Sequence, residues 1–360
     1  MPLRIPRLTP MVATQGNIDS SEFGVVRVET DAGITGWGEI AMSWGRLGRA
    51  LCRDVELSIA PTILGLDPRD VAGCAVAVEQ RLDLATDGAH AARAGVEMAL
   101  LDILGKALDT PVYRLLGGRA RERVPVAWPI PWGDVEATVA QARTAVEAGF
   151  RTVKLKVGRP GSIDREAVSA VRRAVGAEVS IKVDANMAYR SAGAAYAALA
   201  PLEEHGLQLI EQPLRPQDLD ELARLRSRLA TPLLLDESCW HLRDVGEIVR
   251  RGAADVLNVY VTEMGGPLQA WKAFAAAEAA GLVALLGSQC ELGLATAACA
   301  HVGVAVANLG YESDVVGPLR YPRDIVRNPP VIKDGYLHVP EGPGLGVEID
   351  LGQVEALRCG

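Results

Sequence analysis

The chain has 360 residues, which suggests about two domains unless one of them is a barrel. Its 37 Lys and Arg residues against 45 Asp and Glu residues give a net charge of −8, which argues against a nucleic-acid-binding protein, because such a protein needs a basic face. With 49% hydrophobic and 23% charged residues, the composition excludes global disorder and predicts a large buried core.

The six cysteines are scattered and form no CxxC pair, which indicates reduced thiols in a cytoplasmic protein. The N-terminal segment carries three early prolines and no long apolar core, so we expect no signal peptide. The apolar stretches meet charges or glycine well before 18 residues, and we therefore expect no membrane span.

Residues 1–120 have the pattern of strands followed by helices. Residues 25–30 and 34–40 alternate in polarity on either side of Asp31-Ala32-Gly33, which predicts a β-hairpin. From about residue 49 the pattern becomes helical and ends at Gly117-Gly118. We expect an α+β domain here.

From residue 124 the chain consists of short apolar runs separated by helical stretches. The last polar residue of the middle runs recurs at 156, 184, 211, 236 and 260, a spacing that fits one strand, one helix and two loops. The eight runs cover residues 124–127, 153–157, 179–184, 207–211, 233–236, 256–260, 283–286 and about 308–311. They predict a barrel over residues 121–325, with a doubly wound open sheet as the alternative.

Residues 326–360 no longer follow this repeat. Residues 331–339 hold an Asp334-Gly335 turn between apolar runs, which predicts one more hairpin. We expect this C-terminal segment to return to the first domain and pack on it.

Acidic residues stand at the ends of three consecutive predicted strands, in the motifs DAN, EQP and DES: Asp184, Glu211 and Asp236. Neighbouring strands lie about 4.8 Å apart and barrel active sites lie at the carboxyl ends of the strands, so these carboxylates are expected to converge. Three close carboxylates repel one another unless a cation lies among them, and oxygen ligands suit Mg²⁺. Any one of these acids alone could instead bond backbone N–H groups or pair with an arginine.

Glu237 competes with Asp236 as the third ligand, and strand alternation allows only one of them to point inward. We choose Asp236 because it is the first to leave the apolar run. Lys154 and Lys156 are two residues apart, so both leave the same face of their strand. Two adjacent ammonium groups lower each other's pKa, which would help one of them act as a base, while a solvated strand end is the alternative.

These motifs, in this order, resemble the enolase superfamily, and in detail the muconate lactonizing subgroup of the mandelate racemase/muconate lactonizing enzyme family. Residues 92–118 are similar to the last helices of that family's capping domain, and PEGPGLG at 340–346 resembles its C-terminal signature. Residues 288–293 (SQCELG) and 311–318 (YESDVVGP) resemble the segments after strands seven and eight. The resemblance implies a modified (β/α)₇β barrel under an α+β cap built from both chain ends.

The resemblance also implies abstraction of a proton α to a substrate carboxylate, with Mg²⁺, or Mn²⁺, stabilising the enediolate. It matches Asp184, Glu211 and Asp236 to the metal ligands, Lys156 to the base, and Lys154 to the group that tunes this base and contacts the carboxylate. Residues that match the surrounding polar or substrate-binding positions are Asn186, Glu237, Glu291 and Asp314. A small carboxylate substrate and a homo-oligomer are implied as well.

The sequence departs from the family pattern at Tyr260, where the family places a second lysine ahead of a Gly-Gly pair. Tyrosine, with an ordinary pKa of about 10, is a poor base at neutral pH but a good hydrogen-bond donor. We therefore expect one-base chemistry, either β-elimination or syn-lactonisation, with Tyr260 orienting the substrate or protonating a leaving group. The alternatives are a racemase or epimerase that uses Tyr260 as its second acid/base, a catalytically retired relative that still binds metal and carboxylate, and a convergent metal-dependent lyase such as an aldolase.

Four of the six tryptophans fall near the predicted rim of the barrel. Trp44 and Trp128 are candidates for substrate contact, and Trp132 and Trp240 lie nearby in the same loops. Tryptophan faces attract ammonium groups, so a cyclic or N-substituted amino-acid-like carboxylate is expected to bind better than a sugar acid. The alternative is that these rings only fill space between the loops and the barrel.

Overall fold

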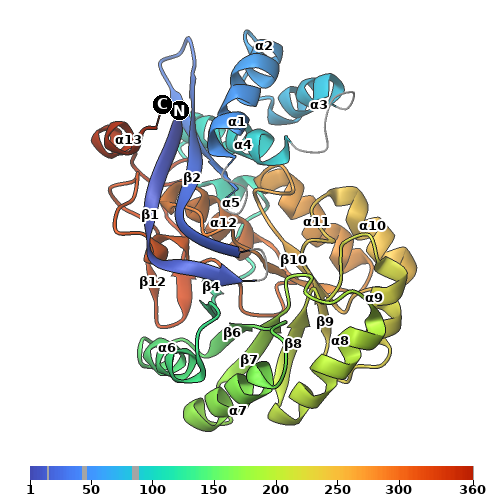
Figure 1. Cartoon of the computed structure of the whole chain (residues 1–360). Helices are drawn as coiled ribbons and strands as arrows, with labels where there is room; N and C mark the ends of the chain where they lie inside the picture. Colours follow the sequence, from blue (N-terminus) through green and yellow to red (C-terminus); the bar gives the residue numbers. More distant parts are fainter. Residues whose placement is uncertain (14–15, 43–46, 83–88, 360) are drawn as a thin grey trace.

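A curled parallel sheet ringed by helices lies beneath an N-terminal α+β cap (Figure 1). The computed structural model describes residues 1–13, 16–42, 47–82 and 89–359. This arrangement confirms the predicted fold class, a modified (β/α)₇β barrel with an α+β cap, and excludes the open doubly wound sheet.

The cap sheet is antiparallel, in the order β1-β2-β3: β1 Pro2–Ala13, β2 Gly16–Glu29 and β3 Thr35–Ala41. The predicted hairpin is present, with Gly33 at φ +77° and the Thr30 N–H donating to the Ile34 carbonyl at 3.1 Å. Strand β1 was not predicted, because its three prolines disfavour a strand. It is an edge strand, where a missing N–H is tolerated, and its register shifts between Pro6 and Met11.

Helix α4 (His90–Ala107) packs directly against β3, and two glycines of the strand permit the close approach. A Cβ atom at Gly38 would lie 1.7 Å from the Gly95 carbonyl oxygen of α4, and one at Gly36 would lie 2.1 Å from that of Ala99. The cap helices are α1 Gly48–Asp54, the π-helical turn Val55–Ile59, α2 Ala60–Ile63, α3 Val71–Leu82, α4 His90–Ala107 and α5 Val112–Leu115.

The barrel sheet contains seven parallel strands in sequential order from β5 to β11. They are β5 Trp128–Ile130, β6 Thr152–Lys156, β7 Ser180–Asp184, β8 Leu207–Glu211, β9 Leu233–Leu235, β10 Val256–Val259 and β11 Val283–Leu286. Residues 308–314 join the two edges: Asp314 N–H donates to Leu286 O, and Ala127 N–H donates to Ser313 O. The eighth predicted strand is therefore a bridging segment with isolated pairings.

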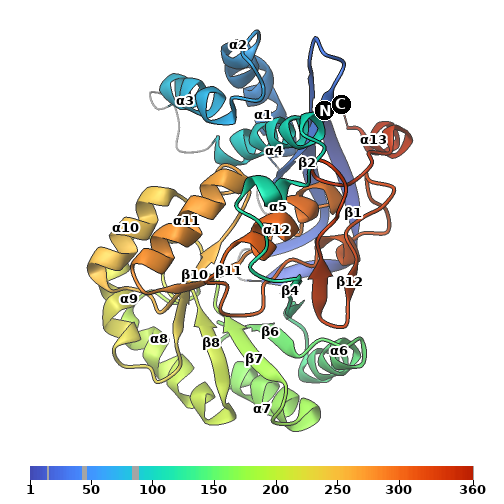
Figure 2. The ribbon, with the colours of Figure 1, turned by 180° about the vertical axis from the view of Figure 1, so that it is seen from behind.

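The first predicted strand is divided between two sheets. Residues 123–125 form β4 (Arg123–Pro125), which pairs with the C-terminal hairpin, and only the residues that follow enter the barrel. Helices surround the sheet on its outer face (Figure 2): α6 Val135–Glu147, α7 Ile163–Val175, α8 Ala192–Leu199, the 3₁₀ turn Ala200–His205, α9 Leu219–Arg226, α10 Leu242–Arg251, α11 Pro267–Ala279, α12 Gly293–Ala305 and the 3₁₀ turn Gly317–Arg320.

The C-terminal hairpin consists of β12 (Ile332–Lys333) and β13 (Tyr336–His338), as predicted. It pairs with β4 at the entrance to the barrel, so the expectation that the hairpin itself packs on the first domain is wrong. The residues that follow do return to the cap. The Leu345 N–H donates to Asp102 of α4 at 2.9 Å, and after α13 (Leu351–Leu357) the Cys359 N–H donates to the Pro2 carbonyl at 3.1 Å.

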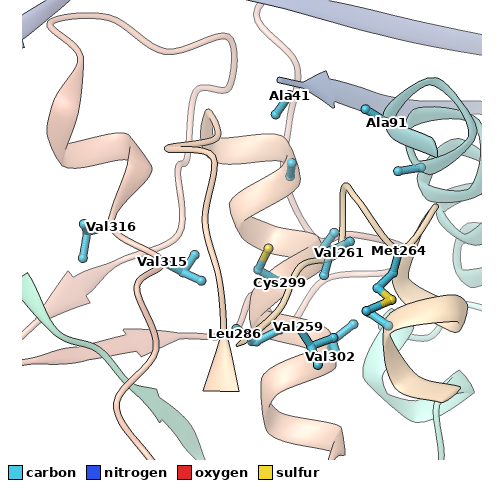
Figure 3. Close-up of a cluster of buried hydrophobic side chains, with 14 of the residues drawn as sticks. Ala41, Ala91, Val259, Val261, Met264, Leu286, Cys299, Val302, Val315 and Val316 are labelled. Atoms are coloured by element: carbon cyan, nitrogen blue, oxygen red, sulfur yellow. The ribbon is translucent and has the colours of Figure 1, made fainter. Parts of the chain in front are cut away.

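One hydrophobic core runs through both the cap and the barrel. Figure 3 shows part of this core: Ala41 of β3 and Ala91 of α4 belong to the same cluster as Val261, Met264 and Cys299 of the barrel. A small second cluster fills the barrel interior: Leu209, Leu234, Val256 and Leu285. The cap is therefore fixed to the barrel by continuous packing over the site described next.

Candidate active site

Strand register places the polar residues of three neighbouring strands side by side. Lys154 is paired with Lys182, Lys156 with Asp184, and Asp184 with Glu211. Because the strands are parallel, these side chains meet at the same end of the barrel. The sequence-based expectation that they converge is thus met for β6, β7 and β8.

The backbone just beyond the strand ends is strained. Asn186, Met187, Gln212 and Cys290 all have positive φ angles, from +34° to +62°, a region that residues with a side chain rarely adopt. Such strain persists only where the surrounding structure enforces it, and it gathers at functional sites. Here three of these residues, Asn186, Met187 and Cys290, line the cavity at the strand ends.

Lys154 is the centre of a buried ionic network. Its Nζ lies 3.2 Å from both Glu211 carboxylate oxygens, 2.5 Å from Asp314 Oδ2 and 3.4 Å from Asp184 Oδ2. Although burial lowers the pKa of Lys154, the Asp314, Glu211 and Asp184 carboxylates raise it well above its ordinary value. The expectation that the neighbouring lysine depresses this pKa is therefore wrong, because three carboxylates lie within 3.4 Å of the amine.

Lys182 belongs to the same network and was missed from the sequence. It is fully buried, and its Nζ donates to Asp314 Oδ1 at 3.2 Å and to the Glu312 carbonyl at 2.6 Å. Lys182 precedes Asp184 by two residues, so strand alternation alone would have placed both on the inner face. Asp314 lies between two ammonium groups: burial raises its pKa, but Lys154 and Lys182 lower it below the ordinary value.

Lys156 lies two residues further along the strand, on the wall of the cavity. Its Nζ donates to Asp184 Oδ2 and to Asn186 Oδ1, both at 2.6 Å. Burial alone would raise the pKa of Asp184, but the Lys156 and Lys154 ammonium groups hold it at about 2. Asn186 in turn donates to Glu237 Oε1 at 3.3 Å, which links this amine to the segment that follows β9.

Asp236 follows β9 and receives two side-chain hydrogen bonds. The Tyr260 hydroxyl donates to Asp236 Oδ2 at 2.8 Å, and Trp240 Nε1 donates to Asp236 Oδ1 at 3.5 Å. Burial, followed by the Asp236 carboxylate, raises the pKa of Tyr260 well above its ordinary value. The phenol is therefore a hydrogen-bond donor to Asp236 and a poorer base than an ordinary tyrosine.

The remaining acids repel one another. Burial, together with the Asp184 carboxylate and against the pull of Lys154, raises the pKa of Glu211 well above its ordinary value. Burial, Glu237 and Asp184 do the same for Asp236, and burial and Asp184 raise the pKa of Glu237 to about 8. The site thus holds more carboxylates than its three lysines neutralise.

A cavity of about 150 Å³ opens over these strand ends. Its lining includes predicted site residues from several strands: Lys156, Asp184, Asn186, Asp236, Glu237, Tyr260 and Asp314. Three methionines (Met11, Met42 and Met187), together with Trp240, Ser288, Gln289 and Cys290, complete most of the wall. The methionines come from the cap and from a rim loop, and no motif in the sequence pointed to them.

Two of the residues predicted to surround the site or bind the substrate do not border this cavity. Glu291 is fully buried, and its carboxylate accepts hydrogen bonds from Ser288 Oγ and the Gln289 N–H, so it shapes the loop behind the wall. Trp128 packs on Phe150, with ring centroids 5.1 Å apart, and carries the Arg320 guanidinium on its face. Trp44 lies outside the residues that the structure describes.

The side chains of this site fit a hard divalent cation. Mg²⁺ prefers oxygen ligands, and the buried carboxylates here outnumber the ammonium groups. Among the described residues, however, no three Asp, Glu, His or Cys side chains already stand in a metal-coordinating arrangement. The Lys154 ammonium lies among the carboxylates instead.

Two family models together match most of the chain. The mandelate racemase/muconate lactonizing enzyme N-terminal domain matches residues 3–117, and the enolase C-terminal domain-like model matches residues 137–354. The chain belongs to the mandelate racemase/muconate lactonizing enzyme family. The predicted resemblance is thereby confirmed, and the protein is an enzyme of this family.

Individual relatives of this family differ in their named reactions. The chloromuconate cycloisomerase of Cupriavidus pinatubonensis is 35% identical over 92% of this chain and 89% of its own length. The N-succinyl-L-Arg/Lys racemase of Bacillus cereus is 31% identical over 97% of this chain and 93% of its own length. The crystal structure of the muconate lactonizing enzyme from Pseudomonas fluorescens with muconolactone superposes with a TM-score of 0.93 at 31% identity, covering 100% of this chain and 97% of the other.

Enzymes of the mandelate racemase/muconate lactonizing enzyme family generally use a divalent metal, typically Mg²⁺, and act on small carboxylates. In the described part of the chain, no helix is both long enough and apolar enough to cross a membrane.

Proposed function

We propose that this protein catalyses metal-dependent transfer of a proton at the carbon α to a substrate carboxylate, with Lys156 as its single acid/base. The reaction is a cycloisomerisation or the equivalent β-elimination. One observation carries this proposal: of the described residues that border the cavity, Lys156 alone is an amine, and Tyr260, which stands where the family pattern has a second lysine, donates its hydroxyl to Asp236.

Asp184, Glu211 and Asp236 would hold the divalent cation, Mg²⁺ or Mn²⁺. A cation bound there supplies electrostatic stabilisation of the negative charge that develops on the substrate carboxylate. The support for this ligand set is its all-oxygen chemistry, and the burial and mutual repulsion that together raise the pKa of Glu211 and Asp236. Asn186 and Glu237 extend this polar wall toward the cavity.

Lys156 is anchored from one side by Asp184 and Asn186, so its amine is held at a fixed place on the cavity wall. In the lactonising direction, a carboxylate oxygen of the substrate forms a bond to the β-carbon, and Lys156 gives its proton to the α-carbon. In the reverse direction Lys156 removes that proton while the C–O bond breaks and its electron pair leaves with the carboxylate. Lys154, fixed by Glu211 and Asp314, keeps a positive charge beside the reacting carboxylate.

Tyr260 orients Asp236 and presents a donor rather than a base. A racemase needs an acid/base on each face of the planar intermediate, and a phenol held by Asp236 cannot accept the second proton. Racemisation is therefore the less favoured activity, although a relative from Bacillus cereus carries that name.

The test is hydrogen exchange at the α-carbon in D₂O with muconolactone and a panel of N-acyl amino acids, followed by NMR. We expect Lys156→Ala to slow exchange by about 10²- to 10⁴-fold, the usual contribution of a general acid/base. Tyr260→Phe should cost less, about ten- to hundred-fold, the value of one charge-assisted hydrogen bond. Lys333→Ala, an exposed lysine of the C-terminal hairpin, is the matched control and should exchange normally.

Exchange that survives Lys156→Ala would overturn the proposal. Racemisation of an N-acyl amino acid that disappears in Tyr260→Phe would establish the two-base alternative. Retro-aldol cleavage without α-exchange would instead favour a convergent lyase.

We also propose a cytoplasmic homo-oligomer without nucleic-acid or membrane partners. The net charge of −8 supports the absence of nucleic-acid partners. The six cysteines, each a free thiol, support a cytoplasmic location.

A further inference from the structure

One edge of strand β2 is uncovered near its turn to β3. Strand β1 pairs with β2 only as far as Gly24, and Met1 continues the pairing at Val25. Strand β2 itself runs on to Glu29, paired with β3 on its other side. No other segment of the described chain pairs with this last part of β2. The turn between β2 and β3 projects past the N-terminus at the top of the cap (Figure 1).

The hydrogen bonds of β2 show which backbone groups face the open edge. The Thr30 N–H donates to the Ile34 carbonyl, on the β3 side, whereas the Val25 N–H donates to the Met1 carbonyl, on the β1 side. These directions alternate along a strand, so the N–H and C=O groups of Arg27 and Glu29 face the open edge. The edge thus presents two donors and two acceptors, a pattern that another extended backbone matches.

The same two residues carry opposite charges. The side chains of Arg27 and Glu29 are 46% and 64% exposed, leave the same face of the strand and contact each other. In an antiparallel pair, residues whose backbones exchange hydrogen bonds lie directly opposite each other. A two-fold axis at Val28 would therefore place Arg27 of each copy opposite Glu29 of the other. All the outward backbone groups and both pairs of charges would be satisfied at once.

Other two-fold positions on this edge are less favourable. An axis at Arg27 would bring the arginines of the two copies together, and an axis at Glu29 would do the same for the glutamates. An axis at Arg27 would also require the backbone of Val25, which Met1 already occupies. Only the axis at Val28 agrees with both the hydrogen-bond direction and the charges.

Exposed apolar side chains lie beside this part of the strand. Leu64 and Leu66, which follow α2, are 78% and 45% exposed. Together with residues 26–31 they line an open groove of about 580 Å³ in the cap. Apolar surface of this kind favours association, because the hydrogen bonds of one short edge bury little area by themselves.

We propose that two copies of this chain associate through the open edge of β2, so that their cap sheets form one continuous antiparallel sheet about a two-fold axis at Val28. An interface of this kind uses the same surface on both copies and closes on itself. The inference goes beyond the proposed reaction and gives the proposed homo-oligomer a defined contact. It assigns Arg27 and Glu29 to recognition between copies.

The test is the molar mass and dissociation constant of the full chain, measured by sedimentation over a series of concentrations. We expect Arg27→Glu and Glu29→Arg each to weaken self-association about ten- to hundred-fold, because each change turns two attractive pairs into repulsive ones. The double variant Arg27→Glu, Glu29→Arg restores opposite charges and should associate like the wild type. Arg224→Glu, which changes an exposed arginine of α9 that pairs with Glu221, is the matched control and should also associate normally.

Mixing the two single variants gives a sharper result. One then carries two acidic residues at the edge and the other two basic residues, so the mixed pair regains attraction at both positions. We expect the 1:1 mixture to associate more tightly than either variant alone, which damage to the fold could not produce. Glu29→Pro, which also removes an outward N–H, should weaken association more than Glu29→Gln.

A monomeric wild type would overturn the inference and would mean that the two charges only protect the edge from unwanted pairing. An oligomer that keeps its mass in both single variants, or a mixture that gains no affinity, would reject this contact and leave the proposed homo-oligomer standing. If the proline variant does not fold, the charge exchange and the mixture decide. Because no turnover is measured, the outcome is independent of the Lys156 exchange test.

Discussion

Glu39 is a buried carboxyl group that links the cap to the barrel. It accepts hydrogen bonds from the Leu292 N–H at 2.8 Å and the Ala295 N–H at 2.9 Å, at the start of α12. Burial nevertheless raises its pKa from 4.5 to about 8. Between these two values the folded protein keeps a proton that the unfolded chain has released, so the free energy of unfolding falls as the pH rises from about 4.5 to about 8.

Glu39→Gln removes this titration. We expect the variant to lose less stability than the wild type across that pH window, with a slope smaller by up to about 1.4 kcal/mol per pH unit. Urea unfolding at a series of pH values measures the slope. Glu178→Gln, at an exposed position of the α7–β7 loop, is the control and should follow the wild type. Parallel curves for the wild type and Glu39→Gln would contradict the assignment.

At the residue scale, the sequence predicted which side chains gather but not how they pair. Strand-end position was sufficient to place Lys156, Asp184 and Asp236 at one cavity. It could not show that Asp314, 160 residues from Lys154, reaches the same amine, and that contact reverses the expected direction of the lysine's pKa. Trp128 and Glu291 do not border the cavity, because a rim position does not reveal which way a side chain points.

At the scale of elements, the contact between β3 and α4 depends on the missing side chain of Gly38. A methyl group there would collide with the Gly95 carbonyl, and neither backbone segment can move without disturbing the cap core. We expect Gly38→Ala to lower the free energy of unfolding by about 1–3 kcal/mol or more. Chemical denaturation measures this loss.

A substitution at the control glycine is expected to have the opposite effect on the free energy of unfolding. Gly193 lies in α8, and no neighbouring atom lies within 4 Å of the place that a methyl group would occupy there. Gly193→Ala should therefore be neutral or stabilise the protein by up to about 1 kcal/mol. Equal effects at the two positions would show that packing against α4 is not the reason for Gly38.

The repeat spacing of apolar runs predicted most barrel strands to within a residue or two, because strands buried on both faces leave a clear signal in the sequence. The signal fails where pairing depends on distant partners. Residues 123–125 pair with a hairpin more than 200 positions later, and residues 308–314 join two edges through isolated bonds. Strand β1 was hidden by prolines that only an edge strand tolerates.

At the scale of the whole molecule, the two regions matched by separate family models share one hydrophobic core. We therefore expect a single cooperative unfolding transition. Hydrogen exchange followed by mass spectrometry should give the same opening free energy for peptides from α4 in the cap and α12 in the barrel. A distinctly lower value for α4 would mean that the cap opens by itself.

The backbone also brings the first and last described residues together, through Cys359 and Pro2 and through the pairing of Leu3 with Arg358. The two ends of the described chain therefore lie side by side. A short linker that joins them, with a new chain break in an exposed barrel loop, would give a circular permutant with the same architecture. In such a permutant the segments would be synthesised in a different order, while the interactions that define the native structure stay the same.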